Sequence, residues 1–249
     1  MFCFIKLNCE ILYDFIMLIQ GVLLSLIAGL AITAGAWLAS LRLFKSVWVQ
    51  EEFRHTITAF GGGALVSAIA FVLIPEGARQ QSSFSTILTF FAGGLVFMFI
   101  DRLLAEAKNP MAQFIAMMLD FIPEAIVLGA ILTEDIRKAV FITCVIAAQN
   151  LPEGYAAYIE MQENRRKKES LWKFFFVGIT GPIYILLGSK LFVPYPHGIL
   201  SAIMTFCSGG ILYLVFEDIA PRSVMNKHWL PPFGAVAGFT VGLAGYLYT

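Results

Sequence analysis

Charged residues are scarce in this chain of 249 residues: they make up 14% of the sequence, whereas hydrophobic residues make up 59%. A soluble domain usually carries about 25% charged and 45–50% apolar residues. The deficit excludes an ordinary water-facing surface. The formal net charge is zero and no basic, aromatic-rich surface is present, so we expect no nucleic-acid partner.

Cysteine and histidine are also sparse and scattered. The four cysteines, Cys3, Cys9, Cys144 and Cys207, form no Cys-x-x-Cys pair and no Cys/His cluster, which argues against a disulfide framework or a zinc finger. The chain lacks an ATP-binding motif, His-Glu-x-x-His, a Ser/His pair and Gly-x-Ser-x-Gly. We therefore expect neither an enzyme nor a bound prosthetic group.

Long apolar segments dominate what remains. They recur along the whole chain at about 20 residues each, the length that carries a helix across roughly 30 Å of hydrocarbon. The sequence predicts an all-α fold, a polytopic membrane helix bundle with about eight transmembrane helices in a single domain over residues 1–249. The predicted spans are 17–41, 57–77, 85–104, 111–133, 138–160, 172–193, 197–217 and 231–249.

The first 16 residues differ from the rest. Glu10 and Asp14 interrupt their apolar run, and no cleavage site for a signal peptide follows. Either Met1 or Met17 could be the true start, and the sequence leaves this choice open.

The distribution of Lys and Arg predicts the orientation. The longest polar connection, 161–171, contains Arg165-Arg166-Lys167-Lys168, and cytoplasmic loops are enriched in such residues. Placing this loop in the cytoplasm also places most other Lys and Arg residues there. We therefore expect an integral protein of the plasma or inner membrane with both termini outside.

Polar residues recur inside the fourth and fifth spans. The fourth contains Asp120-Phe121-Ile122-Pro123-Glu124, and the fifth contains Gln149-Asn150-Leu151-Pro152-Glu153. Residues four apart lie on one face of a helix. A hairpin that turns near residue 136 would bring the two repeats to the same depth, about 14 residues or roughly 21 Å from the turn. The prolines would free the carbonyls of Leu119 and Ala148 beside them.

The energy of burial makes these acids informative. An ionised carboxylate at the centre of a membrane helix costs about 2.5–3.5 kcal/mol. No Lys or Arg of the predicted spans lies at matching depth to offset Asp120, Glu124 and Glu153. A bound divalent cation or protonation would offset the cost of burying these carboxylates. The pattern therefore favours an ion or proton pathway over a protonated structural cluster.

These residues resemble the ZIP (Zrt/Irt-like protein) family of divalent-metal transporters, bacterial branch. The specific part of the resemblance is Gln149-Asn150-Leu151-Pro152-Glu153-Gly154, and it is weaker over Asp120–Ala125. The family's span count, its outside termini and its basic loop after the fifth span also agree. The resemblance implies inward transport of Zn, Fe or Mn, with the lipid bilayer as a partner. It also suggests a second copy of the chain, in a homodimer, as a partner.

The resemblance also implies a ligand set. Carried over by position, the ligands of the first metal are Asp120, Glu124, Gln149 and Glu153. The family usually has His at the position of Asp120, and a carboxylate there shifts the preference in principle from zinc toward manganese or iron. For a second metal, Asn150 survives, whereas Phe121 replaces Asn and Gly181 replaces Glu. We therefore expect one metal site, or one strong and one degraded site.

Other acids lie near the ends of spans. Glu76 ends the second span at the predicted outer side, and Glu217 and Asp218 end the seventh at the inner side. Acids in a vestibule would concentrate cations, but acids at helix ends are also ordinary solvated groups. Both interpretations stay open for these three residues.

Two alternatives to transport of metal remain. The chain could be a non-transporting, ZIP-like membrane protein that binds metal or regulates another process, which the loss of polar groups at Phe121 and Gly181 motivates. It could also be a proton-linked carrier of another solute, whose flux competing divalent metals would leave unchanged.

Overall fold

The structure is a computed structural model that describes residues 2–41, 47–106, 112–133, 135–163, 171–191, 197–225 and 228–248. The side chains of residues 2–14, Leu119, Asp120 and Pro123 are among those outside this description. The described residues form helices joined by short turns and contain no strand. The helices are α1 (Phe2–Ser40), α2 (Val47–Ala68), η1 (Ile69–Leu73), α3 (Ile74–Ala78), α4 (Ser83–Glu106), α5 (Ala112–Leu132), α6 (Ile136–Glu163), α7 (Leu171–Ile179), α8 (Gly181–Leu191), α9 (His197–Leu214), η2 (Val215–Ile219), α10 (Ala220–Arg222) and α11 (Leu230–Tyr248).

The predicted all-α membrane bundle is confirmed. Within the described residues, six helical segments are long and apolar enough to cross a membrane. They are Phe15–Ser40, Trp48–Ala78, Ser83–Leu103, Leu171–Ser189, Gly198–Arg222 and Leu230–Tyr248. The motif helices α5 and α6, of 21 and 28 residues, lie outside this group. They coincide with the predicted spans 111–133 and 138–160, whose crossing of the membrane stays a prediction.

Helix ends differ from the expected spans in several places; for example, α2 begins at Val47, ten residues before the expected start at 57. Helix α1 begins at Phe2 and runs without a break through Met17, so residues 2–16 are not set apart from the first span in their backbone. The predicted span 172–193 is two helices separated at Thr180, because Pro182 has no N–H to continue the helical ladder. The Thr180 hydroxyl donates instead to the Val177 carbonyl at 2.6 Å.

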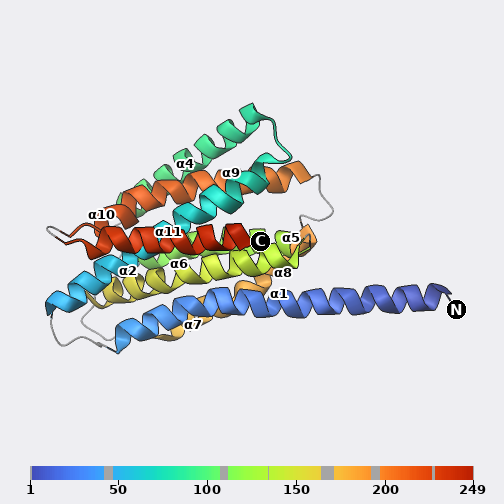
Figure 1. Ribbon diagram of the computed structural model, residues 1–249, viewed down its shortest axis with the longest axis horizontal. Helices are drawn as coiled ribbons and strands as arrows, with labels where there is room; N and C mark the ends of the chain where they lie inside the picture. Colours follow the sequence, from blue (N-terminus) through green and yellow to red (C-terminus); the bar gives the residue numbers. More distant parts are fainter. Residues whose placement is uncertain are drawn as a thin grey trace.

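Helix α6 lies at the centre of the packing. It contacts α1 along most of its length and also contacts α2 and α5. Helices α2 and α11 form a second pair, and α4 and α9 form a third. Figure 1 shows α4 and α9 at one edge of the molecule and α1 and α7 at the opposite edge, with the N-terminal part of α1 extending beyond the other helices.

Two π-helical segments interrupt the described helices, and both precede a proline. Segment η1 ends two residues before Pro75, and η2 ends two residues before Pro221. The N–H of Ile74 bonds to the Ile69 carbonyl, five residues back, instead of four. A proline ring clashes with the carbonyl four residues earlier, and a widened turn relieves that clash. The hydropathy pattern of the sequence predicts neither segment.

Glycines let α1 and α6 approach at backbone distance. A Cβ atom added to Gly35 would overlap the Leu151 carbonyl, and one added to Gly154 would overlap the Ile32 carbonyl. Small residues at such crossings allow close packing of membrane helices. This contact fixes the position of α6, the helix that carries half of the polar motif.

We predict that Gly35→Val destabilises the protein, because its side chain would force α1 away from α6. Overpacking of this kind costs about 1–3 kcal/mol or more, and each kcal/mol lowers the unfolding midpoint by roughly 2–4 °C in a chain of this size. Thermal unfolding in detergent measures the shift. Gly198→Ala is the matched control, since its Cβ would meet only the Gln80 carbonyl at an ordinary 3.8 Å. Equal midpoints for the two variants would contradict the close α1–α6 contact.

Candidate metal site between α5 and α6

A short turn joins the two motif helices into an antiparallel hairpin. The Asp135 amide donates to the Ile131 carbonyl at the end of α5, at 3.0 Å. The Asp135 carboxylate then accepts the Arg137 amide at 2.8 Å. This is a side-chain cap at the start of α6, where the first amides have no helical partner. The cap sets the register in which α6 returns along α5.

The hairpin brings Glu124 of α5 and Gln149 of α6 into direct contact. The Gln149 side-chain amide donates a hydrogen bond to Glu124 Oε1. Glu124 is 5% exposed and Gln149 is fully buried. A buried polar group needs such a partner to offset its lost hydration. The two halves of the repeat therefore meet at one depth, as the antiparallel geometry requires.

Further oxygen donors lie on α6 around this contact. Glu153 follows Gln149 by one helical turn and is 7% exposed. Among the described residues, the amide oxygens of Gln149 and Asn150 are buried and accept no hydrogen bond. Carboxylate and amide oxygens are ligands for divalent cations. The chemistry of the donors present therefore fits a cation better than a neutral solute.

The Asn150 side chain also contacts α1. Its side-chain amide donates to the Ala28 carbonyl of α1 at 2.8 Å. Residues one position apart on a helix point about 100° apart, so Asn150 faces α1 while Gln149 faces α5. The structure thus separates Asn150 from the Glu124–Gln149 contact while keeping it buried.

A small cavity borders Glu124. It measures about 20 Å³, which is enough room for one water-sized particle. Apart from Glu124 its walls are apolar and come from α2, η1, α5 and α6. These residues are Ala68, Val72, Leu73, Val127, Ile142, Val145 and Ile146. The widened turn η1 thus forms one wall beside the carboxylate, and π-helical turns are frequent at functional sites.

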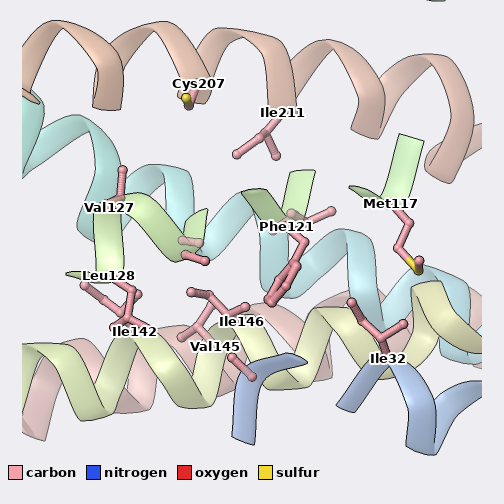
Figure 2. Close-up of a cluster of buried hydrophobic side chains, with 14 of the residues drawn as sticks. Ile32, Met117, Phe121, Val127, Leu128, Ile142, Val145, Ile146, Cys207 and Ile211 are labelled. Atoms are coloured by element: carbon pink, nitrogen blue, oxygen red, sulfur yellow. The ribbon is translucent and has the colours of Figure 1, made fainter. Parts of the chain in front are cut away.

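Phe121 fills the space on the other side of the motif. Its side chain is fully buried, and its ring meets Tyr184 of α8 edge-on at a centroid distance of 6.3 Å. A Cβ on Gly181 would lie 3.3 Å from the tip of that ring. Figure 2 shows Phe121 within the apolar core, together with Met117, one turn earlier on α5, and Ile146 of α6. Neither a phenylalanine ring nor a glycine offers a side-chain ligand for a metal.

The remaining predicted ligand, Asp120, lies outside the described side chains, as do Leu119 and Pro123. Among the side chains that are described, no three His, Cys, Asp or Glu residues converge into a metal-binding group. Pro152 is described, and it packs against Gly61 of α2, whose Cβ would lie 3.0 Å from the proline ring. The roles predicted for Asp120, Glu124, Gln149, Asn150 and Glu153 as ligands stay predictions.

The three possible vestibule acids have different surroundings. Glu76 is paired with two cations, Arg79 and Lys138, each at 2.8 Å. Asp218 pairs with Arg222 at 2.8 Å, and Glu217 is exposed beside it in η2. The link between Glu76 and Lys138 joins residues 62 positions apart and was not foreseen. No local pattern in the sequence signals a pairing between such distant segments.

Known proteins provide an independent comparison. The chain is 22% identical over 264 residues to the zinc transporter ZupT of Streptococcus mutans, covering 90% of this chain and 95% of that protein. It is 20% identical over 265 residues to the zinc transporter ZupT of Chlorobium phaeovibrioides, covering 90% and 96%. A third zinc transporter ZupT, from Chlorobium luteolum, is 22% identical over 262 residues, covering 89% and 94%. No protein-family model matches the chain.

We predict that Gln149→Glu destabilises the protein at neutral pH and that acid restores part of the loss. The change replaces the donor to Glu124 with a second carboxylate, and two adjacent buried carboxylates repel unless they share a proton. The free energy of unfolding of Gln149→Glu is therefore highest at low pH and falls as the pH rises. Gln149→Leu is the control, since it removes the donor without adding charge. The unfolding midpoint of each variant is measured from pH 5 to 8. The same pH dependence in both variants would contradict the contact between Glu124 and Gln149.

Proposed function

Since the chain belongs to the ZIP family of divalent-metal transporters, we propose that it carries a divalent cation across the membrane through a site between α5 and α6. It is an integral membrane protein, and it is a transporter rather than an enzyme. The observation that carries the proposal is the buried contact of Glu124 with Gln149, with Glu153 one turn further along α6.

The proposed ligands are Asp120, Glu124, Gln149 and Glu153. Support comes from their position on two packed helices, the burial of Glu124, Gln149 and Glu153, and the amide oxygen of Gln149 that accepts no hydrogen bond. Asp120 precedes Glu124 by one turn on the same helix face. A divalent cation would offset the charge of carboxylates that burial otherwise disfavours.

Zinc is the proposed substrate. Its support is the name of the relatives, all three of which are called zinc transporters. No comparison supports iron or manganese, although the oxygen-rich ligand set would suit harder ions. We place the protein in the plasma or inner membrane with both termini outside, because the basic segment 165–168 would then lie in the cytoplasm. A homodimer remains an expectation from the family alone.

We predict that Glu153→Gln abolishes zinc uptake into liposomes loaded with a zinc-sensitive dye. The change keeps the size of the side chain and removes a charged ligand, so uptake should fall by at least about tenfold, the factor for 1.4 kcal/mol of lost binding. Asp101→Asn is the matched control: it removes one carboxylate from α4, where the Tyr213 hydroxyl donates to Asp101 at 3.1 Å and can donate equally to an amide oxygen.

The outcomes separate the proposal from its alternatives. Wild-type uptake that survives Glu153→Gln would place the path elsewhere. Zinc binding without uptake would favour the non-transporting, regulatory protein. Uptake of another solute that zinc, iron and manganese all leave unchanged would favour the proton-linked carrier.

We predict a single zinc ion per chain. Phe121 and Gly181 supply no side-chain ligand at two positions where the family resemblance places ligands of a second ion, so a second ion would lack both of them. Equilibrium dialysis of the purified protein, followed by elemental analysis, measures the ratio. Two ions per chain, both lost in Glu124→Gln, would show that the ring at position 121 does not prevent a second site.

A further inference from the structure

One carboxylate near the end of the hairpin is held by two cations. Lys138 Nζ of α6 lies 2.8 Å from Glu76 Oε1, and an Arg79 guanidinium nitrogen lies 2.8 Å from Glu76 Oε2. The Glu76 side chain is 15% exposed, that of Lys138 32% and that of Arg79 57%. Each oxygen of Glu76 therefore has a cation of its own, and the group sits at the edge of the bundle rather than inside it.

This ion pair lies about one helical turn beyond two walls of the cavity that borders Glu124. Lys138 precedes Ile142 by one helical turn, and Ile142, Val145 and Ile146 form the α6 wall of the cavity. Glu76 follows Leu73 and Val72 by about one turn, and these form the opposite wall. The residues from Lys138 to Ile146 on α6 and from Val72 to Glu76 on η1 and α3 thus form a column beside the cavity, and the ion pair joins the two sides of this column at one end.

The two cations differ in what they connect. Arg79 follows Glu76 by three residues, so that pair stays within one end of the helix formed by α2, η1 and α3. Lys138 belongs to α6, the helix of Gln149 and Glu153, and crosses to α3. A partly exposed ion pair contributes little stability and is readily broken. Release of Lys138 alone would therefore open the column while Glu76 and Arg79 remained paired.

We propose that Lys138 is a latch over this mouth of the transporter, and that a divalent cation opens it by displacing the Lys138 ammonium from Glu76. The inference rests on the proposed function for its transport step but not for the latch itself. At equal distance a doubly charged ion attracts a carboxylate twice as strongly as an ammonium group does, whereas a singly charged ion has no such advantage. Lys138 thereby favours divalent over monovalent ions at the entrance.

Thiol labelling in detergent tests the latch without any need for transport. Ile142→Cys is placed in a chain whose four natural cysteines are changed to alanine, and its reaction with a water-soluble maleimide is timed. Lys138→Met should raise the labelling rate about three- to fivefold, the factor expected when a partly exposed ion pair is lost. Glu76→Gln should raise the labelling rate by a similar factor, because it removes the other partner of the ion pair. Lys138→Arg keeps the charge and should restore the slow rate.

Arg79→Met is the matched control for charge. It removes a cation from the same carboxylate, but one that does not bridge to α6, so labelling at position 142 should stay slow. Thermal unfolding of each variant checks that it is folded. An unchanged rate in folded Lys138→Met, or an equal rise in Arg79→Met, would overturn the latch.

Zinc uptake into liposomes tests the displacement step. In Lys138→Met, uptake at subsaturating zinc should rise by the same factor as labelling, and sodium chloride should inhibit it more than choline chloride at equal ionic strength. Faster labelling with unchanged zinc uptake and no inhibition by sodium would overturn the role of Lys138 in admitting metal. If neither wild type nor variant moves zinc, the proposed function fails, while the labelling result still decides the latch.

Discussion

Burial of carboxylate and amide groups between α5 and α6 is the constraint on which the rest of the structure depends. Glu124, Gln149, Asn150 and Glu153 are all at most 7% exposed. Such groups are costly unless partners surround them. Gln149 donates to Glu124, and Asn150 donates to the Ala28 carbonyl of α1. Three helices must therefore meet at one depth, and the glycine contacts of α1 with α6 make that approach sterically possible.

The close backbone contacts of the described glycines fall into two sets. One set joins α1, α5, α6, α7 and α8, and the other joins α2 with α11 and α4 with α9. Their pairs include Gly29–Gly178, Gly129–Ile185 and Gly35–Leu151 in the first set, and Gly63–Ala235 and Gly93–Phe206 in the second. Where α6 meets α2 and α11, the nearest atoms to Gly61 and Gly245 are instead the side chains of Pro152 and Phe141. The cavity beside Glu124 and the Lys138–Glu76 pair lie along this boundary, where side chains rather than backbones are the nearest neighbours of the glycines.

The sequence could predict the helices and the meeting of the repeats because both follow from local patterns. Apolar runs of one length indicate membrane helices, and an i, i+4 repeat on both arms of a hairpin places Glu124 opposite Gln149. Other features depend on contacts between distant segments or on competing local effects. Hydropathy does not encode how the backbone adjusts to a nearby proline. Such adjustments produce the π-helical turns before Pro75 and Pro221 and the break at Thr180. The pairing of Lys138 with Glu76 depends on how α3 sits against α6, which neither segment specifies alone.

Charge balance links the single-site arrangement to proton coupling. Asp120, Glu124 and Glu153 carry three negative charges when ionised, and one divalent cation neutralises two. If a single ion is bound, as proposed, one negative charge remains among carboxylates that burial disfavours. A proton on one carboxyl group removes that charge without another metal ligand. Binding of the cation and the protonation of these acids are then linked, because ligating carboxylates must be deprotonated. In the proposed arrangement, with one metal ion and three acids, transport therefore depends on pH, whereas a second metal ion would supply the missing positive charge itself.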